Sequence, residues 1–335
     1  MQAAIYGFEG LELTSSERAF FRDCDPAGFI LFKRNCGDRD QLLRLTDSLR
    51  DLAARADLPI LIDQEGGRVS RMGPPEWPSF PAAERFADLY RVAPSSAIEA
   101  TRANARAIAL MLGEVGINVN ALPLLDVRQE GASDIIGDRA LGSEPMQVAA
   151  LGRAVLDGMA SAGVAGIVKH MPGHGRALVD SHKELPVVTV SAEELEMDLE
   201  PFERLSRAPM GMVAHVVYAA WDADRQASMS PVVIGDIIRE RIGFGGWLIS
   251  DDIGMEALQG DFGSRAAGVV AAGCDVALHC SGDMAEMTAI ACSVPVMDAE
   301  GEARLARAMA EIRVERDGLD LAESIATRDA LLAIT

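Results

Sequence analysis

The feature that most constrains the fold is a regular alternation of short apolar segments with helix-like segments along the chain. Strands that alternate with helices pair in parallel through right-handed crossovers. The apolar segments predict eight strands, at residues 3–6, 29–32, 59–62, 117–125, 164–168, 210–214, 247–249 and 276–278. Between and after them we expect helices at 41–56, 97–115, 145–162, 192–207, 230–241, 264–272 and 301–313, and a terminal helix on the outside after residue 318.

The count of eight strands favours a closed (β/α)8 barrel of the TIM type, although an open doubly wound sheet shows the same alternation. A chain of 335 residues suits a barrel of about 250 residues with insertions. No linker or repeat divides it, so we expect a single barrel domain over residues 1–335, with a C-terminal helical extension from about 301. Residues 73–81 carry four prolines and read as a rigid surface excursion, and residues 129–142 read as a loop.

Composition restricts the possible partners and the compartment. The formal net charge of −20 argues against nucleic acid and against an anionic membrane as partner. Five cysteines without a Cys-x-x-Cys pair indicate reduced, mostly buried thiols. Neither a signal peptide nor an apolar run of about 18 residues is visible. We therefore expect a cytoplasmic protein that is a monomer or a weak homo-oligomer.

Most of the apolar segments end in a polar residue. In a barrel, the residues just past each strand lie in one ring on the carboxyl face, where barrel enzymes carry their chemistry. Single polar strand ends occur in any protein, but the combination of several titratable ones favours a site. The strand-end residues concerned are Asp63, Lys169, His170, His215, Asp251 and Asp252.

The richest stretch follows the fifth predicted strand, where three of the five histidines fall within thirteen residues. The strand would deliver Lys169 and His170, and the loop after it would bring His182. Asp180 could fix the imidazole of His182 and favour its protonated form, so that His182 donates and later accepts a proton. Alternatively, a metal ion could be bound by His170, His174, Asp180 and His182, although the Pro and Gly residues at 172, 173 and 175 break any helix that would align 170 with 174.

The pair Asp251-Asp252 at the end of the seventh predicted strand is the best candidate for a carboxylate nucleophile. Adjacent side chains at a strand end point in opposite directions, so only one of them can face the barrel axis. Sequence spacing does not choose between them. One of the two, plausibly Asp252, could instead cap a helix that begins near Gly254.

A third motif, Asp63-Gln64-Glu65-Gly66-Gly67-Arg68-Val69-Ser70-Arg71, follows the third predicted strand. Its Gly pair could bend the chain and return Arg71 towards Asp63. A carboxylate beside a guanidinium suits hydroxyl-rich or acidic ligands. With Arg139 and Lys169, Arg71 would form a local positive pocket. The absence of Gly-x-Ser-x-Gly, P-loop and Gly-x-Gly-x-x-Gly motifs argues against serine hydrolases, nucleotidases and dinucleotide enzymes.

These motifs together resemble one known family. The sequence, from about residue 5 to about residue 285, is similar to the bacterial β-N-acetylglucosaminidases of glycoside hydrolase family 3, the NagZ type. The resemblance implies a barrel without the second sandwich domain of many relatives. It also implies cofactor-free, retaining hydrolysis of terminal β-linked N-acetylglucosamine, notably from GlcNAc-1,6-anhydro-MurNAc muropeptides in peptidoglycan recycling. The resemblance rests on Lys169-His170-x-Pro172-Gly173-His174-Gly175, Asp180-Ser181-His182, residues 63–69 and Ser250-Asp251-Asp252-x-x-Met255.

The resemblance also assigns roles by position. Asp251 matches the nucleophile, His182 the general acid/base and Asp180 its partner. A nucleophile that forms a glycosyl-enzyme, and an acid that becomes the base for water, make a consistent reaction. The sugar-binding positions are matched by Asp63, Arg71, Arg139, Lys169 and His170, and the roles of His174 and His215 stay open.

Two residues depart from the family pattern: Met171 replaces a common Phe, and Arg176 replaces a small or acidic residue. We place both on the loop after the strand, where they affect loop conformation and leaving-group preference. Three alternatives stay open. A histidine acid/base could tolerate phosphate as the attacking group, which would give a phosphorylase. The other two are a metal-dependent barrel hydrolase and a sugar-binding protein without activity.

Overall fold

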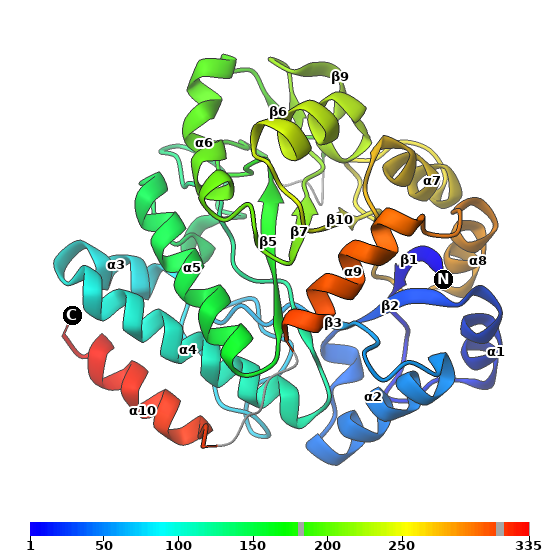
Figure 1. Ribbon diagram of the computed structural model, residues 1–335, viewed down its shortest axis with the longest axis horizontal. Helices are drawn as coiled ribbons and strands as arrows, with labels where there is room; N and C mark the ends of the chain where they lie inside the picture. Colours follow the sequence, from blue (N-terminus) through cyan, green and yellow to red (C-terminus); the bar gives the residue numbers. More distant parts are fainter. Residues whose placement is uncertain (180–183, 313–317, 335) are drawn as a thin grey trace.

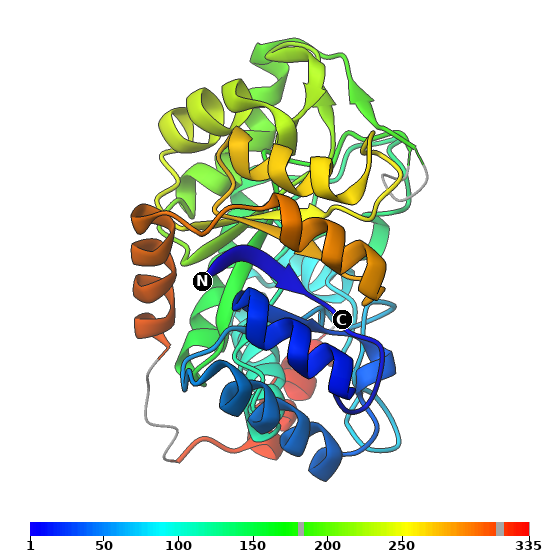
Figure 2. The same cartoon turned by 90° about the vertical axis from the view of Figure 1, so that its right-hand side faces the viewer.

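The structure is a computed structural model, and it describes residues 1–179, 184–312 and 318–334. In this part of the chain eight parallel strands close into a barrel in the order β1-β11-β10-β7-β5-β4-β3-β2, with helices around it (Figures 1 and 2). The predicted (β/α)8 barrel is therefore confirmed. The strands are β1 (Gln2–Tyr6), β2 (Pro26–Leu31), β3 (Ile60–Ile62), β4 (Val119–Asn120), β5 (Ala165–Met171), β7 (Met210–Val213), β10 (Trp247–Asp252) and β11 (Val276–His279).

The helices include every segment predicted as helical and three more, which are α1, α3 and α8. Residues 233–241, at the predicted helix 230–241, form a π-helix instead of an α-helix. The helices of the described residues are α1 (Ser15–Cys24), α2 (Arg39–Ala53), α3 (Glu84–Val92), α4 (Pro94–Glu114), α5 (Pro145–Ser161), α6 (Ala192–Arg204), η4 (Val233–Arg241), α7 (Phe262–Ala272), α8 (Met284–Ser293), α9 (Ala299–Glu311) and α10 (Leu321–Leu332), with short 3-10 turns η1 (Lys33–Asn35), η2 (Gly137–Arg139) and η3 (Ala227–Met229).

Burial along the strands explains why they read as continuous apolar runs. Every residue of β1, β2, β3, β5, β7 and β11 is buried, as expected for a parallel sheet covered by helices on one face and packed on itself on the other. In β10 only the last two residues, Asp251 and Asp252, are half-buried. The barrel closes where β1 meets β11, with Ala4 opposite Ala277. Polar groups therefore reach solvent at the carboxyl ends of the strands.

Capping residues set where several helices begin. In α6 the Ser191 hydroxyl accepts from the backbone N–H of Glu194, and the Glu194 carboxylate accepts from the backbone N–H of Ser191, so the two residues form a capping box. The missed helix α1 begins with the same device, formed by Thr14 and Glu17. This pair was a signal in the sequence that could have located α1.

A small second sheet was not predicted. It has the strand order β6-β8-β9 and consists of β6 (Val187–Val188), β8 (Val217–Tyr218) and β9 (Asp222–Gln226). It lies at one end of the barrel, close to α6 (top of Figure 1). Strands β6 and β8 have only two residues each, and β9 consists mostly of exposed polar residues, so none of the three shows an apolar pattern long enough to be recognised in a sequence.

Two peripheral segments lie where the sequence predicted them. Residues 73–81 form an excursion at the surface, with Pro74, Pro75 and Glu76 exposed, and the buried rings of Trp77 and Phe80 anchor it. Helix α10 packs on α4 and α3 on the outside of the barrel (Figure 1), where buried Arg328 donates to Asn104 at 3.2 Å. No helix in the described part of the chain is both long enough and apolar enough to cross a membrane.

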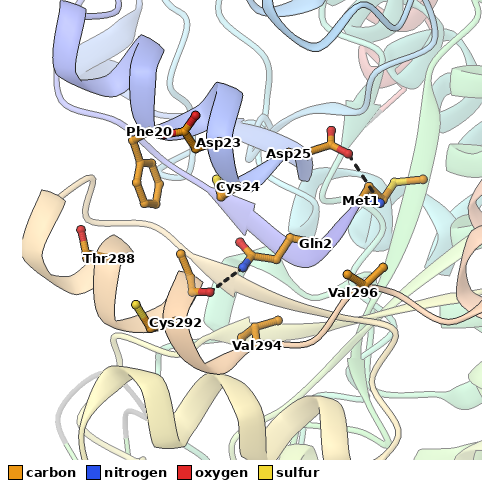
Figure 3. A pocket seen from close by; sticks show the side chains of 11 residues that line it. Met1, Gln2, Phe20, Asp23, Cys24, Asp25, Thr288, Cys292, Val294 and Val296 are labelled. Atoms are coloured by element: carbon orange, nitrogen blue, oxygen red, sulfur yellow. Dashed lines mark hydrogen bonds and ion pairs between the residues drawn. The ribbon is translucent and has the colours of Figure 1, made fainter.

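All five cysteines are free thiols, but only Cys274 is fully buried and Cys292 is exposed. Cys24 and Cys292 line a cavity of about 530 Å³ between α1, α8 and the start of β1 (Figure 3). The Gln2 side chain crosses this cavity and donates to the Ala291 carbonyl at 2.9 Å. Because Gln2 is at the amino end of its strand, this cavity lies at the opposite end of the barrel from the polar strand ends.

Candidate active site

The carboxyl ends of β3, β5 and β10 meet around a second cavity, of about 400 Å³. The predicted residues of the binding site and both candidate nucleophiles line it together. The predicted acid/base His182 and its partner Asp180 lie outside the described residues. The predicted residues that line the cavity are Asp63, Arg71, Arg139, Lys169, His170, His174, Asp251 and Asp252.

Lys169 is the centre of the charge network in this cavity. Its ammonium group lies 3.2 Å from Asp63 Oδ1 and 2.8 Å from Glu65 Oε1, and its side chain is 3 % exposed. The predicted return of Arg71 to Asp63 is present, because Arg71 Nη2 donates to Asp63 Oδ2 at 3.2 Å. On the other side, Arg139 donates through Nε and Nη2 to the two oxygens of Glu65, each at 2.8 Å.

Charge pairing sets the protonation states of these groups. Burial opposes ionisation of Asp63 and Glu65, but Lys169 and the arginines outweigh it, so the pKa of Asp63 is lowered and that of Glu65 falls to about 2. Burial likewise opposes the charge on Lys169, and its two carboxylate partners raise its pKa. All three groups are therefore charged at neutral pH.

The sequence missed Glu65, although it lies in the quoted motif at residues 63–71. Because Asp63 and Glu65 pair with the three cations, the cavity is not the simple positive pocket that the sequence suggested. It offers fixed donors and acceptors side by side. Such an array suits a hydroxyl-rich ligand, whose OH groups both donate and accept.

Asp126, which follows β4, is a second residue of this site that was not predicted from the sequence. It is fully buried and accepts from the His170 ring Nδ1 at 2.8 Å, from the His170 backbone N–H at 3.2 Å and from the His174 backbone N–H at 2.7 Å. Burial opposes its ionisation, but His170 and these hydrogen bonds lower its pKa to about 2. An ionised carboxylate only accepts, so Nδ1 of His170 carries the proton and Nε2 is the nitrogen left for a ligand.

The two candidate nucleophiles differ in the hydrogen bonds that their carboxylates accept, and Asp251 Oδ1 accepts from the backbone N–H of Asp252 at 2.8 Å. Asp252 Oδ1 accepts from the backbone N–H groups of Gly254 at 3.0 Å and Cys280 at 3.2 Å, which fixes the turn after β10. No helix of the described chain begins at Gly254, so Asp252 stabilises a turn and not the expected helix. Burial raises the pKa of Asp252 to about 6. Asp252 thus has a structural use, and Asp251 is the better candidate for chemistry.

His215, after β7, has a structural environment. It is fully buried, its Nδ1 lies 2.6 Å from the Ser228 hydroxyl, and its Nε2 lies 3.0 Å from the Asp252 carbonyl oxygen. A carbonyl only accepts, so Nε2 donates to it and Nδ1 of the neutral ring accepts from Ser228. His215 therefore holds the backbone next to Asp251.

We expect His215 to stay neutral at pH 6.5, where an ordinary histidine is about half protonated, because burial lowers its pKa. The unfolded state then binds more protons, so this contribution to the unfolding free energy is full above about pH 6.5 and declines as the pH falls. Ring ¹⁵N signals recorded between pH 8 and 6, assigned with His215→Gln, should show Nε2–H and no titration. A midpoint near 6.5 would contradict this assignment.

Metal binding was the alternative for the histidine-rich stretch. Within the described residues, no group of three or more His, Cys, Asp or Glu side chains is arranged to hold a metal ion. His170 Nδ1 is used by Asp126, and two members of the predicted ligand set, Asp180 and His182, lie outside those residues.

The two departures from the family pattern lie in different places. Met171 is the last residue of β5 and is fully buried, so its expected place on the loop was wrong. Arg176 does lie on the loop after β5. There it donates to the Asp198 carboxylate of α6.

Comparison with known proteins finds relatives in both sequence and structure. Residues 8–314 match the glycosyl hydrolase family 3 N terminal domain. A beta-hexosaminidase from Methylococcus capsulatus is 37% identical over 94% of each chain, and one from Alkalilimnicola ehrlichii is 39% identical over 90% of this chain and 87% of its own. Crystal structures of NagZ from Neisseria gonorrhoeae, native and in complex with N-trifluoroacetyl-D-glucosamine, align with a TM-score of 0.88 and 30% identity, covering 99% of this chain and 98% of theirs.

Proposed function

We propose a specific reaction for this chain, which belongs to glycosyl hydrolase family 3 and is a glycosidase of the β-N-acetylhexosaminidase class. The enzyme hydrolyses terminal β-linked N-acetylglucosamine with retention of configuration. Its natural substrates are GlcNAc-1,6-anhydro-MurNAc muropeptides of peptidoglycan recycling, in the cytoplasm. The choice of these substrates and of this compartment follows from the family resemblance.

One observation carries the proposal: the paired charges of Asp63, Lys169 and Glu65 lie in the same cavity as Asp251. In the proposed complex the sugar hydroxyls bind Asp63, Arg71, Arg139, Lys169 and His170. These side chains are fixed by ion pairs or by Asp126, so little ordering free energy is needed when the sugar binds. The N-trifluoroacetyl-D-glucosamine complex of the gonococcal NagZ supports an N-acylated glucosamine as ligand.

In the first step the Asp251 carboxylate attacks the anomeric carbon while protonated His182 gives its proton to the glycosidic oxygen, which leaves with the aglycone. The second step reverses these roles. Neutral His182 takes a proton from water, and the resulting hydroxide attacks the glycosyl–Asp251 ester and restores the carboxylate. Asp180 keeps His182 in the required tautomer throughout.

The test is hydrolysis of an aryl β-N-acetylglucosaminide, followed by NMR of the first-formed sugar. We expect the β-anomer of free N-acetylglucosamine, unchanged rates with EDTA, and release of N-acetylglucosamine from the anhydro-disaccharide. His182→Ala should lose about 10²-fold on a poor leaving group, because general acid catalysis typically contributes at least that factor.

The other outcomes point to the alternatives. A sugar 1-phosphate formed in phosphate buffer would make the protein a phosphorylase. Activity lost with a chelator and restored with metal would indicate a metal-dependent hydrolase. Binding of N-acetylglucosamine without turnover of any glycoside would indicate a sugar-binding protein.

A further inference from the structure

We propose that Arg176 is a positioning residue of this enzyme. Its ion pair with Asp198 holds the turn at residues 172–177, called here the root turn, against helix α6. The chain continues from the root turn directly to Asp180 and His182. The catalytic part of this inference rests on the proposed function, because it assigns His182 as the acid/base.

The Arg176–Asp198 pair is built as a buried anchor. Arg176 Nε donates to Asp198 Oδ2 at 2.5 Å, and Nη2 of the same guanidinium donates to the Glu194 carbonyl oxygen of α6 at 2.9 Å. The Asp198 side chain is 1 % exposed and that of Arg176 is 15 % exposed. One guanidinium therefore holds two points on the helix, which a lysine ammonium cannot reproduce with the same fixed geometry.

The root turn is held on its other sides by groups from strand β8 and from the segment that follows β4. The buried Tyr218 hydroxyl of β8 donates to the Gly173 carbonyl at 2.8 Å. A Cβ atom on Gly175 would lie 2.0 Å from the Val127 carbonyl oxygen, so the turn packs directly on the chain after β4. The backbone N–H of His174 donates to Asp126, which also holds the His170 ring.

These contacts connect Arg176 to the sugar-binding site by a short path. Asp126 accepts from both sides: from His170 in the cavity and from His174 in the root turn. The root turn also holds the loop that carries Arg139, because the Ser133 backbone N–H donates to the Ala177 carbonyl at 2.9 Å. Asp126 and Tyr218 still hold residues 173 and 174 when Arg176 is replaced, so the sugar-binding residues keep their places and the loss falls on the part of the chain that leaves the turn after residue 176.

Other ion pairs on α6 lack this construction and provide a control. Arg204 and Glu200 form an i,i+4 pair on the same helix with 48 % and 34 % exposed side chains. Such exposed pairs contribute little to stability. In contrast, Asp198 is a buried carboxylate, and burial raises its pKa to about 6 even with Arg176 beside it. The arginine is thus the group that keeps this buried position charged and oriented.

The experiment compares kcat/KM on two β-N-acetylglucosaminides that differ in leaving group. Cleavage of a methyl glycoside requires that the acid protonate the departing methoxy oxygen. Dinitrophenolate is a stable anion and leaves without a proton. We expect Arg176→Ala to lose about 10- to 100-fold on the methyl glycoside and less than about 3-fold on the dinitrophenyl glycoside, because small misplacements of a catalytic group cost such factors. Arg204→Ala should change neither rate by more than about 2-fold.

A second variant controls for unfolding, because Arg176→Ala leaves the buried carboxylate of Asp198 without its ion-pair partner. The double variant Arg176→Met/Asp198→Leu removes both charges, so no buried carboxylate is left unpaired. It should fold and show the same dependence on leaving group. Equal losses on both glycosides, or no loss on either, would overturn the positioning role.

Hydrogen exchange of the peptide that covers residues 171–179 separates failure of this inference from failure of the proposed function. We expect faster exchange in Arg176→Ala than in Arg204→Ala, whether or not the protein hydrolyses glycosides. A wild-type protein inactive on both glycosides would refute the proposed function, and the exchange rates would still decide whether Arg176 holds the root turn. Equal exchange rates in Arg176→Ala and Arg204→Ala would refute the inference that Arg176 holds the root turn.

Discussion

Replacement of Asp251 by alanine is expected to lower kcat/KM on an aryl β-N-acetylglucosaminide by about 10⁴-fold or more. Loss of a covalent nucleophile removes the low-energy route through the glycosyl-enzyme, and comparable knock-outs in other enzymes reach about 10⁶-fold. Added azide should restore part of the rate, because it fits the space of the lost carboxylate, and the product should be the α-azide. Kinetics and NMR of the product measure both effects.

The neighbouring aspartate gives the matched control. Asp252→Asn keeps an oxygen that can accept from Gly254 and Cys280, so it should lose less than about 10-fold. Full activity of Asp251→Ala, together with a large loss in Asp252→Asn, would reverse the assignment and make Asp252 the nucleophile.

Replacement of Lys169 by methionine is expected to destabilise the protein by about 3–5 kcal/mol at pH 7, since it removes one partner of buried charge pairs. Asp63 and Glu65 would keep their negative charges without the ammonium group that lies 3.2 and 2.8 Å from them. Sugar binding should be lost as well, because Asp63 would no longer be held in place. Urea unfolding at pH 7, and titration with N-acetylglucosamine, measure the two effects.

The pH dependence of this loss has a definite sign. The pKa values of Asp63 and Glu65 are lowered in the wild type, so their stabilisation is present above the ordinary carboxyl pKa of about 4 and fades as the pH falls towards 2. The difference between wild type and Lys169→Met should therefore stay constant from pH 7 to about pH 4 and shrink between pH 4 and pH 2. Lys33→Met, the same change at an exposed lysine, should cost less than about 0.5 kcal/mol. A difference in unfolding free energy that stays constant from pH 4 to pH 2 would contradict the proposed charge pairing.

The sequence was sufficient for the barrel and for most of the candidate site, because both depend on local pattern. Alternating apolar segments identify the strands, and the residue that follows each strand lies at the carboxyl face by topology alone. The return of Arg71 to Asp63 could also be predicted, since Gly66 and Gly67 adopt positive φ angles in the bend between them.

What the sequence missed depends on contacts between distant segments. Asp126 looks like the polar end of an apolar run, and its role appears only when His170 and His174 lie against it. Glu65 became significant only when Arg139 and Lys169, far away in the chain, met at its carboxylate. The choice between Asp251 and Asp252 likewise needed the hydrogen bonds of Gly254 and Cys280, since both residues fit the pattern equally well.

The pairing of β1 with β11, in which Ala4 lies opposite Ala277, has a consequence for synthesis on the ribosome. The first strand made cannot find its final neighbour until residue 279 has left the exit tunnel. At about 5–20 residues per second, β1 waits for tens of seconds with one edge open. Such an edge can pair with other nascent chains, so early protection by a chaperone, or by the amphipathic helices α1 and α2, should improve the yield of folded enzyme.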